Sequence, residues 1–208
     1  MAMERRPTEH RRAEIVEAAL RLIATQGIAE LTNKKVADAV GLTTGALFRH
    51  FASMEEILCA VADRVSELLR ATYPAADLPP VERLGRFVDA RAATVGEHVG
   101  ILRLVLSEQF TLALPKEAAS RLREAVMESR AFLVKALREG QERGEIRDDI
   151  PAEILTTVVM GTIQVAAFEM AQSGSMGGMR AVPDAAPRWS PRAGLLKLLA
   201  PLPSKGVD

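Results

Sequence analysis

Three short runs of apolar residues at helical spacing, separated by glycines, restrict the fold of this sequence most. In the first run the spacing of three and four places the apolar side chains on one face of a helix that ends at Gly27. These residues are Ile15, Ala18, Ala19, Leu22 and Ile23. A short helix after Thr32 and a third helix, from Thr43 to about His50, are separated by Gly41. Helices this short need one another to cover their apolar faces.

Residues 32–51 have the layout of a helix-turn-helix unit, in which the second helix enters the DNA major groove. The first helix would lie behind the pair and share a small core with Val36, Val40, Leu47 and Phe51. The exposed face of the third helix would then carry Thr44, Gly45, Ala46, Phe48, Arg49 and His50. An ordinary corner between two bundle helices has the same local pattern, so Gly41 alone does not separate the two interpretations.

The rest of the chain continues with helical patterns and shows no strand pattern. Ser53 is placed to cap a fourth helix, and Pro74 lies beyond its end. Further helices are expected near residues 84–95, 101–110, 116–139, 154–171 and 193–200, with turns at 140–151 and 173–191. Only 4% of the residues are aromatic, while strong helix formers dominate. We therefore expect an all-α protein with about nine helices.

Several classes of protein are excluded by what the sequence contains. A single cysteine, Cys59, cannot form an internal disulfide, and the histidines are too far apart in sequence to indicate a metal site. No motif for a cofactor is present. Gln164 and Glu169 interrupt the most apolar segment, which leaves runs far shorter than the roughly 20 residues of a membrane span. The amino terminus has no apolar signal segment, so we expect a cytoplasmic protein.

The stretch AEIVEAALRLIATQGIAELTNKKVADAVGLTTGALFRHFASMEEIL resembles the DNA-binding domain of the tetracycline-repressor (TetR) family of bacterial transcriptional regulators. The likeness rests on A-A-L-x-L-I-x-x-x-G, T-x-x-x-V-A, G-L-T-T-G-A-L-F-R-H-F and E-E-I-L, all in register, and covers about residues 10–62. The resemblance implies a helix-turn-helix DNA-binding domain at residues 1–53, with a basic arm at 1–12. It implies a helical ligand-binding and dimerisation domain at residues 54–208.

The resemblance also implies roles for individual residues at the DNA. Thr32 and Asn33 would meet phosphates, and Lys34 would reach a phosphate or a base edge. Base edges would face Thr44, Gly45 and Ala46, next to the capping residue Thr43. The sugar-phosphate backbone would be contacted by Phe48, Arg49 and His50.

Two positions depart from the family pattern. Phe48 stands where the family usually has tyrosine, and Met54 stands where lysine is common. Both changes remove a polar contact to phosphate, so weaker DNA binding is expected. The arm with Arg5, Arg6, Arg11 and Arg12 offers a substitute, although a solvated tail would have the same composition.

The resemblance further implies a ligand cavity among the middle helices. Polar groups in otherwise apolar segments suit the orientation of a ligand, although each can equally serve a structural role. These polar residues are His98, Gln109 and Gln164. The apolar candidates are Leu102, Leu106, Phe110, Met127, Met160 and Phe168. We expect a small, mostly apolar effector.

Residues 154–171 are apolar on nearly every side, which predicts a second covering surface. A second copy of the chain, packed about a two-fold axis through this helix and the last one, would supply it and match a palindromic operator. We therefore expect a dimeric, ligand-responsive regulator, most often a repressor in such families. A helical adaptor that binds only proteins is the alternative, and an enzyme is disfavoured because no catalytic motif is present.

Overall fold

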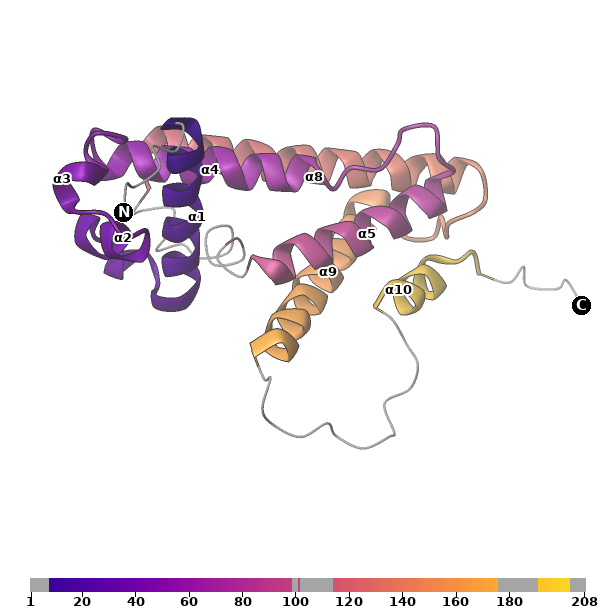
Figure 1. The fold of residues 1–208 in the computed structure, drawn as a ribbon. Coiled ribbons are helices and arrows are strands. Elements are labelled where there is room, and N and C mark those ends of the chain that lie inside the picture. Colours follow the sequence, from indigo (N-terminus) through magenta and orange to yellow (C-terminus); the bar gives the residue numbers. More distant parts are fainter. Residues whose placement is uncertain (1–7, 99–100, 102–113, 176–190, 203–208) are drawn as a thin grey trace, which may run out of the picture. The chain divides into compact units, whose positions relative to one another are not determined.

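The computed structural model describes residues 8–98, 101, 114–175 and 191–202 (Figure 1). Within these residues the chain forms eight α-helices and one 3₁₀ helix and contains no strand, close to the expected nine helices. The elements in order are α1 (Thr8–Gln26), η1 (Ile28–Glu30), α2 (Asn33–Ala39), α3 (Thr44–Leu47), α4 (Met54–Arg70), α5 (Pro80–Glu97), α8 (Lys116–Glu142), α9 (Ala152–Ser175) and α10 (Pro191–Leu199). The segment expected to be helical at 101–110 lies almost wholly outside the described residues.

The helices form two compact units. The first contains Met1–Arg70 with His98–Val126, and the second contains Ala71–Glu97 with Met127–Asp208. All of residues 1–53 belong to the first unit, and the domain boundary after residue 53 stays a prediction.

In the first unit α1 packs against α4 and α2, and α2 packs against α3. The shared core is completely buried at Ile15, Ile23, Val36 and Leu47, as the helical spacing predicts. Burial of each such side chain contributes about 1.5–3 kcal/mol. An ion pair of 2.6 Å between Asp63 of α4 and Arg121 joins the first turns of α8 to this unit.

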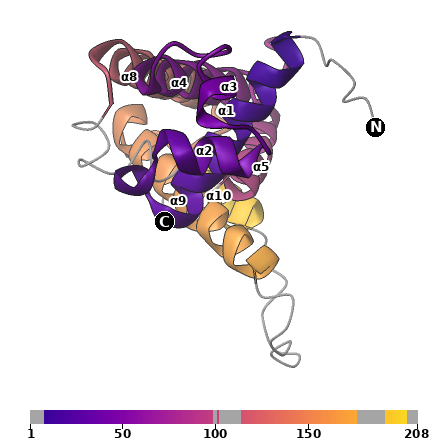
Figure 2. The ribbon, with the colours of Figure 1, turned by 60° about the vertical axis from the view of Figure 1, so that its left-hand side comes forward.

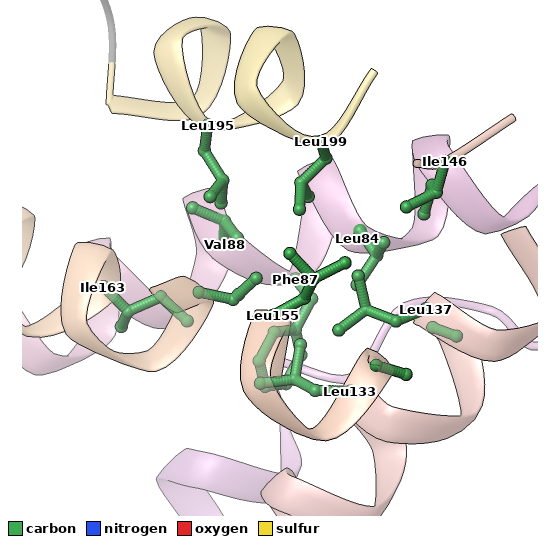
Figure 3. Packing of buried hydrophobic residues seen from close by; sticks show 13 residues of the cluster. Leu84, Phe87, Val88, Leu133, Leu137, Ile146, Leu155, Ile163, Leu195 and Leu199 are labelled. Atoms are coloured by element: carbon green, nitrogen blue, oxygen red, sulfur yellow. The ribbon is translucent and has the colours of Figure 1, made fainter. Parts of the chain in front are cut away.

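In the second unit α5 lies against α9, and α10 packs on both (Figures 1 and 2). Figure 3 shows their core, in which Phe87 of α5 lies among leucines from α8, α9 and α10. The buried residues of this core include Leu84, Leu133, Leu137, Leu155, Ile163, Leu195 and Leu199.

Three helix ends differ from the expected positions. α3 ends at Leu47 rather than near His50, because the N–H groups of Arg49 and His50 bond three residues back, as in a 3₁₀ turn. α8 continues past Gly140, whose missing side chain leaves room for Ile146. α10 begins at Pro191, since proline suits the first turn of a helix.

Candidate nucleic-acid interface

The turn between α2 and α3 is fixed by backbone hydrogen bonds. Gly41 has φ +66°, a conformation that favours glycine. Its N–H donates to the carbonyl of Asp38 at 3.2 Å, and the N–H of Leu42 donates to the carbonyl of Ala37 at 2.9 Å. This pair of bonds is a Schellman motif, which ends α2 and sends the chain directly into α3.

Threonine hydroxyls cap both helices, as the sequence predicts. The Thr32 Oγ1 accepts a hydrogen bond of 3.2 Å from the Lys35 N–H, and the Thr43 Oγ1 accepts one of 3.1 Å from the Ala46 N–H. A hydroxyl that accepts in this way keeps its own O–H as a donor. Both threonines are exposed, so each can cap its helix and also donate to a phosphate oxygen.

The exposed face of α3 and the turn after it carries Thr44, Gly45, Phe48 and Arg49, while Leu47 points into the core. A β-carbon added to Gly45 would meet no atom of the described residues within 4 Å beyond its own helical turn. Packing within the chain therefore does not require glycine here, although glycine weakens a helix by about 1 kcal/mol relative to alanine. The missing side chain leaves the backbone open to close approach by a base edge.

The structure distinguishes the two neighbouring lysines of α2. The ammonium of Lys35 forms an ion pair of 2.7 Å with Glu30, which lowers the pKa of that carboxyl. Lys34 and Arg49 are exposed and form no ion pair with any described residue. Their positive charges therefore remain available to phosphates.

Asn33 and His50 are half-buried, and each has a polar atom without a partner among the described residues. These atoms are the Asn33 Oδ1 and the His50 Nδ1.

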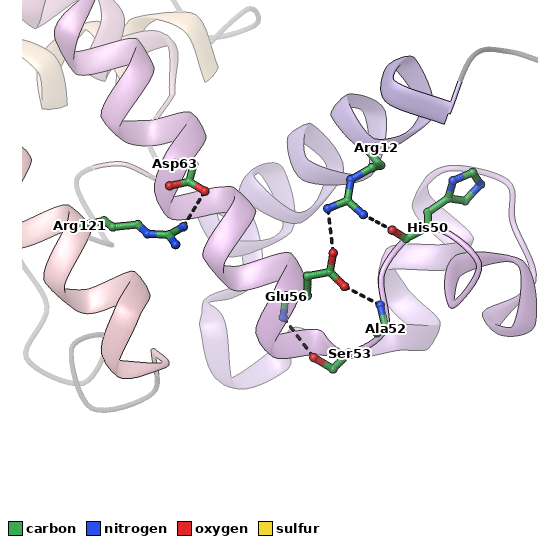
Figure 4. Close-up of polar contacts among 7 residues, drawn as sticks. All are labelled: Arg12, His50, Ala52, Ser53, Glu56, Asp63 and Arg121. Atoms are coloured by element: carbon green, nitrogen blue, oxygen red, sulfur yellow. Dashed lines mark hydrogen bonds and ion pairs between the residues drawn. The ribbon is translucent and has the colours of Figure 1, made fainter.

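Arg12 holds α1 to the segment between α3 and α4 (Figure 4). Its guanidinium donates to the carbonyl of His50, forms an ion pair of 2.8 Å with Glu56, and lies 3.9 Å from the centroid of the Phe51 ring. We call these contacts the Arg12 clamp. Arg12 thus contacts the protein rather than extending as part of an arm, and Arg11 pairs with Glu14 at 2.6 Å.

Glu56 completes the clamp from the first turn of α4. Its carboxylate accepts a hydrogen bond of 2.7 Å from the Ala52 N–H, while its own N–H donates to the Ser53 Oγ at 3.2 Å. The backbone bond from Ala52 and the bond from Arg12 lower the pKa of Glu56. The sequence predicts Ser53 as the cap of this helix but not Arg12 as the partner of Glu56; the S-x-x-E capping pattern is the signal that points to Glu56.

The candidate ligand residues are distributed over several elements. Leu102, Leu106, Gln109 and Phe110 lie outside the described residues. His98 is half-buried directly after α5. Met160 and Gln164 are half-buried on α9, whereas Met127 on α8 and Phe168 on α9 are exposed. None of the five candidates that the structure describes lines the hollow of about 640 Å³ between α5, α9 and the start of α10.

Two protein-family models match this chain. The model of bacterial regulatory proteins of the tetR family matches residues 15–61, and that of the tetracyclin repressor-like C-terminal domain matches residues 77–174.

Two transcriptional repressors are similar in sequence. The chain is 27% identical over 159 residues to the HTH-type transcriptional repressor KstR2 of Mycobacterium tuberculosis, with 74% of this chain and 78% of the relative covered. It is 31% identical over 154 residues to the HTH-type transcriptional repressor SCO4008 of Streptomyces coelicolor, with 72% and 74% covered.

Solved structures share the fold. The ketosteroid transcriptional regulator KstR2 of Mycobacterium tuberculosis superposes with a TM-score of 0.71 at 22% identity, over 91% of this chain and 95% of that one. AibR in complex with isovaleryl coenzyme A and operator DNA gives 0.69 at 20% identity, over 91% and 98%. Since the two family models fall on the capped helix-turn-helix and on the helices that follow it, this chain belongs to the TetR family of bacterial transcriptional regulators.

Proposed function

We propose that the protein is a ligand-responsive transcriptional repressor that binds a palindromic operator as a homodimer in the cytoplasm. The main observation in its support is the open face of α3: among the described residues, no atom would block a β-carbon at Gly45 and no carboxylate pairs with Arg49. The repressors similar in sequence favour this function over an enzyme or a protein-only adaptor.

In this proposal each side chain has one role at the DNA. Thr44, Gly45 and Ala46 face base edges, while Arg49 and the Nε2 of His50 bind phosphate oxygens. Other backbone contacts come from Thr32, Asn33, Lys34, Thr43 and the exposed ring of Phe48. Thr43 also sets the start of α3 through its cap.

An exposed apolar stripe on α9 supports the homodimer. Ile154, Val158, Gly161, Val165 and Phe168 follow one another at alternating steps of four and three residues. This average spacing of 3.5 residues suits two helices that pack along one seam. The four apolar side chains are exposed, and a β-carbon at Gly161 would meet no atom within 4 Å in the described part of the chain, so a second backbone could approach there.

α9 is also long and apolar enough to cross a membrane by length and composition. Its opposite face, however, buries Leu155, Val159, Ile163 and Ala167 in the second unit. The apolar surface that remains is thus a stripe along one side. A second copy that brings its own α9 and α10 would cover this stripe. It would also cover Leu198 of α10, which is 51% exposed.

Release from DNA requires an effector that binds the DNA-free conformation more tightly, since only a difference in affinity shifts an equilibrium. We propose a small, mostly apolar effector bound among the helices that follow α4. Its occupancy would move α4 and so change the separation of the two α3 helices in the dimer. AibR, which shares the fold, was solved with isovaleryl coenzyme A and operator DNA.

The combined variant Arg49→Ala and His50→Ala tests the DNA contacts. It is expected to lose the gel shift of DNA from upstream of its own gene, while the dimer and its thermal unfolding midpoint stay unchanged. Lys35→Ala is the matched control, because Lys35 is paired with Glu30. Retention of wild-type affinity by the double variant would contradict the proposal.

The variant Val165→Glu tests the dimer. A charge in the stripe is expected to produce monomers in sedimentation experiments and to abolish operator binding. Met127→Glu is its control, since Met127 is equally exposed but lies on α8. If Val165→Glu remains a dimer in sedimentation experiments, the stripe on α9 is not the dimer interface.

A further inference from the structure

Two buried arginines occupy the same face of α5. Arg83 and Arg91 are 7% and 5% exposed, and their separation of eight positions corresponds to about two helical turns. Arg83 is neutralised: its guanidinium bonds the carboxylate of Glu139 and donates to the carbonyl of Ala76 at 3.1 Å. Arg91 forms no ion pair with any described residue.

Aromatic rings surround Arg91 instead of carboxylates. Its guanidinium carbon lies 4.7 Å from the centroid of the Phe87 ring and 5.4 Å from that of Tyr73. Phe132 packs against both rings, with centroid distances of 4.8 and 5.1 Å. The Tyr73 hydroxyl lies 3.2 Å from the Ser129 Oγ. Burial lowers the pKa of Arg91, and the neighbouring Tyr73 opposes this effect. The rings attract a cation but supply no negative charge.

The unsatisfied atoms of Arg91 lie on one edge of its guanidinium. They are the Nε and the Nη2, both buried and without a hydrogen-bond acceptor among the described residues. Because the guanidinium is planar, the N–H groups of this edge point in parallel. Their spacing matches that of two oxygens of one carboxylate or phosphate. A buried donor without an acceptor is unfavourable, so a pair of them on one edge indicates an external anion.

We propose that Arg91 binds the anionic head group of the effector, and that this effector is an amphiphilic acid: an apolar body that ends in a carboxylate or a phosphate. The inference rests on the proposed ligand-responsive function and refines the mostly apolar effector given there. The rings of Tyr73, Phe87 and Phe132 shield the charge pair from water, which strengthens it.

The test uses the full-length protein without DNA and follows its thermal unfolding midpoint. The probes are octanoate, octyl phosphate and octanol, which share an eight-carbon chain and differ in the head group; hexyl and decyl series vary the length. At least one anion is expected to raise the midpoint, because a ligand that binds the folded state stabilises it. The alcohol of the same chain length lacks the charge and is expected to leave the midpoint unchanged. The comparison of octanoate with octyl phosphate identifies the head group.

Arg91→Met removes the charge and the paired N–H donors while it keeps an unbranched side chain that reaches as far as the Nε position. It is expected to fold at least as stably as the wild type without ligand, because an unpaired buried charge has been removed. Its affinity for the anion should fall at least about tenfold, which corresponds to about 1.4 kcal/mol. Arg86→Met is the matched control, since Arg86 is exposed on the same helix and paired with Glu82.

Three results would overturn the proposal: no stabilisation of the wild type by any of the anions, equal stabilisation by the matched alcohol, or an undiminished response of Arg91→Met. If Arg91→Met does not fold, Arg91→Lys decides, because lysine keeps the charge but lacks the paired donors. An affinity of Arg91→Lys for the anion that is about tenfold lower than that of the wild type supports the proposal, and an unchanged affinity contradicts it. Because this assay contains no DNA, its result does not depend on operator binding. A failure of the proposed repressor function is therefore distinguished from a failure of the Arg91 proposal.

Discussion

Replacement of Arg12 by alanine is expected to loosen the attachment of the DNA-reading segment to α1. The substitution removes the bond to the carbonyl of His50, the ion pair with Glu56 and the contact with the Phe51 ring. These contacts hold the turn that follows α3. Arg49 and His50 lie in that turn, so its position determines where two of the proposed phosphate contacts point.

The size of the effect follows from the exposure of the groups. The side chains of Arg12 and Glu56 are 37% and 40% exposed, so their ion pair contributes about 0.5–1 kcal/mol. A charged hydrogen bond to a carbonyl at a half-buried site contributes about 1 kcal/mol. The contact with the ring contributes about 0.5–1 kcal/mol. Together these values predict a loss of about 2–3 kcal/mol in the free energy of unfolding.

Urea unfolding of the full-length protein at fixed protein concentration measures this loss. The two free energies can be compared if the slope of the unfolding free energy against urea concentration, the m-value, is the same for both proteins. Arg11→Ala is the control, because the one ion pair of Arg11 among the described residues is with Glu14 of its own helix; this variant should lose about 0.3–0.5 kcal/mol. Operator affinity of Arg12→Ala is expected to fall about tenfold, or about 1.4 kcal/mol. If Arg12→Ala loses no more stability than Arg11→Ala, the clamp does not hold the turn.

Three further variants probe the same surface. Glu56 has a pKa below its ordinary value of 4.5, so its stabilisation is complete above that pH and is lost as the pH falls through the lower folded-state pKa. The stability difference between wild type and Glu56→Gln, measured by urea unfolding, should therefore be constant down to about pH 5 and shrink below it; a difference that grows in acid refutes this sign. Thr43→Ala removes the cap of α3 and should lower the free energy of unfolding by about 1 kcal/mol and weaken operator binding, whereas unchanged unfolding would mean that the cap is dispensable. Phe48→Tyr adds a hydroxyl at an exposed position and should tighten operator binding in a titration; a fall in affinity would show that Phe48 does not face a phosphate.

Local features of the first unit could be predicted because they depend on neighbours within four residues. The caps at Thr32, Thr43 and Ser53 and the turn at Gly41 are found where the sequence predicts them. In each case a side chain or a glycine satisfies backbone groups three or four positions away. α3 ends earlier than its sequence predicts, because no residue between Leu47 and Phe51 signals the change to 3₁₀ hydrogen bonds.

The ion-pair partners of the charged side chains could not be predicted in this way. Sequence reasoning treated Arg11 and Arg12 alike, and it did not anticipate that Glu30 would engage Lys35 and leave Lys34 available. The burial of two arginines of α5, Arg83 and Arg91, was not predicted either. Their helical spacing indicates only that they share a face. Spacing shows which face a residue occupies but not what that face meets.

The sequence by itself determined the all-helical class, the positions of the caps and most of the exposed face of α3, since periodicity and capping act within one or two helical turns. Ala46 and His50, predicted on that face, are half-buried. Only the tertiary structure decided which charges are neutralised, because the partners are distant in sequence. Glu56 lies 44 residues from Arg12, and Glu139 lies 56 residues from Arg83. Arg91 has the same local pattern as Arg83 but no described carboxylate in reach, and this difference arises only when α5 packs in the fold.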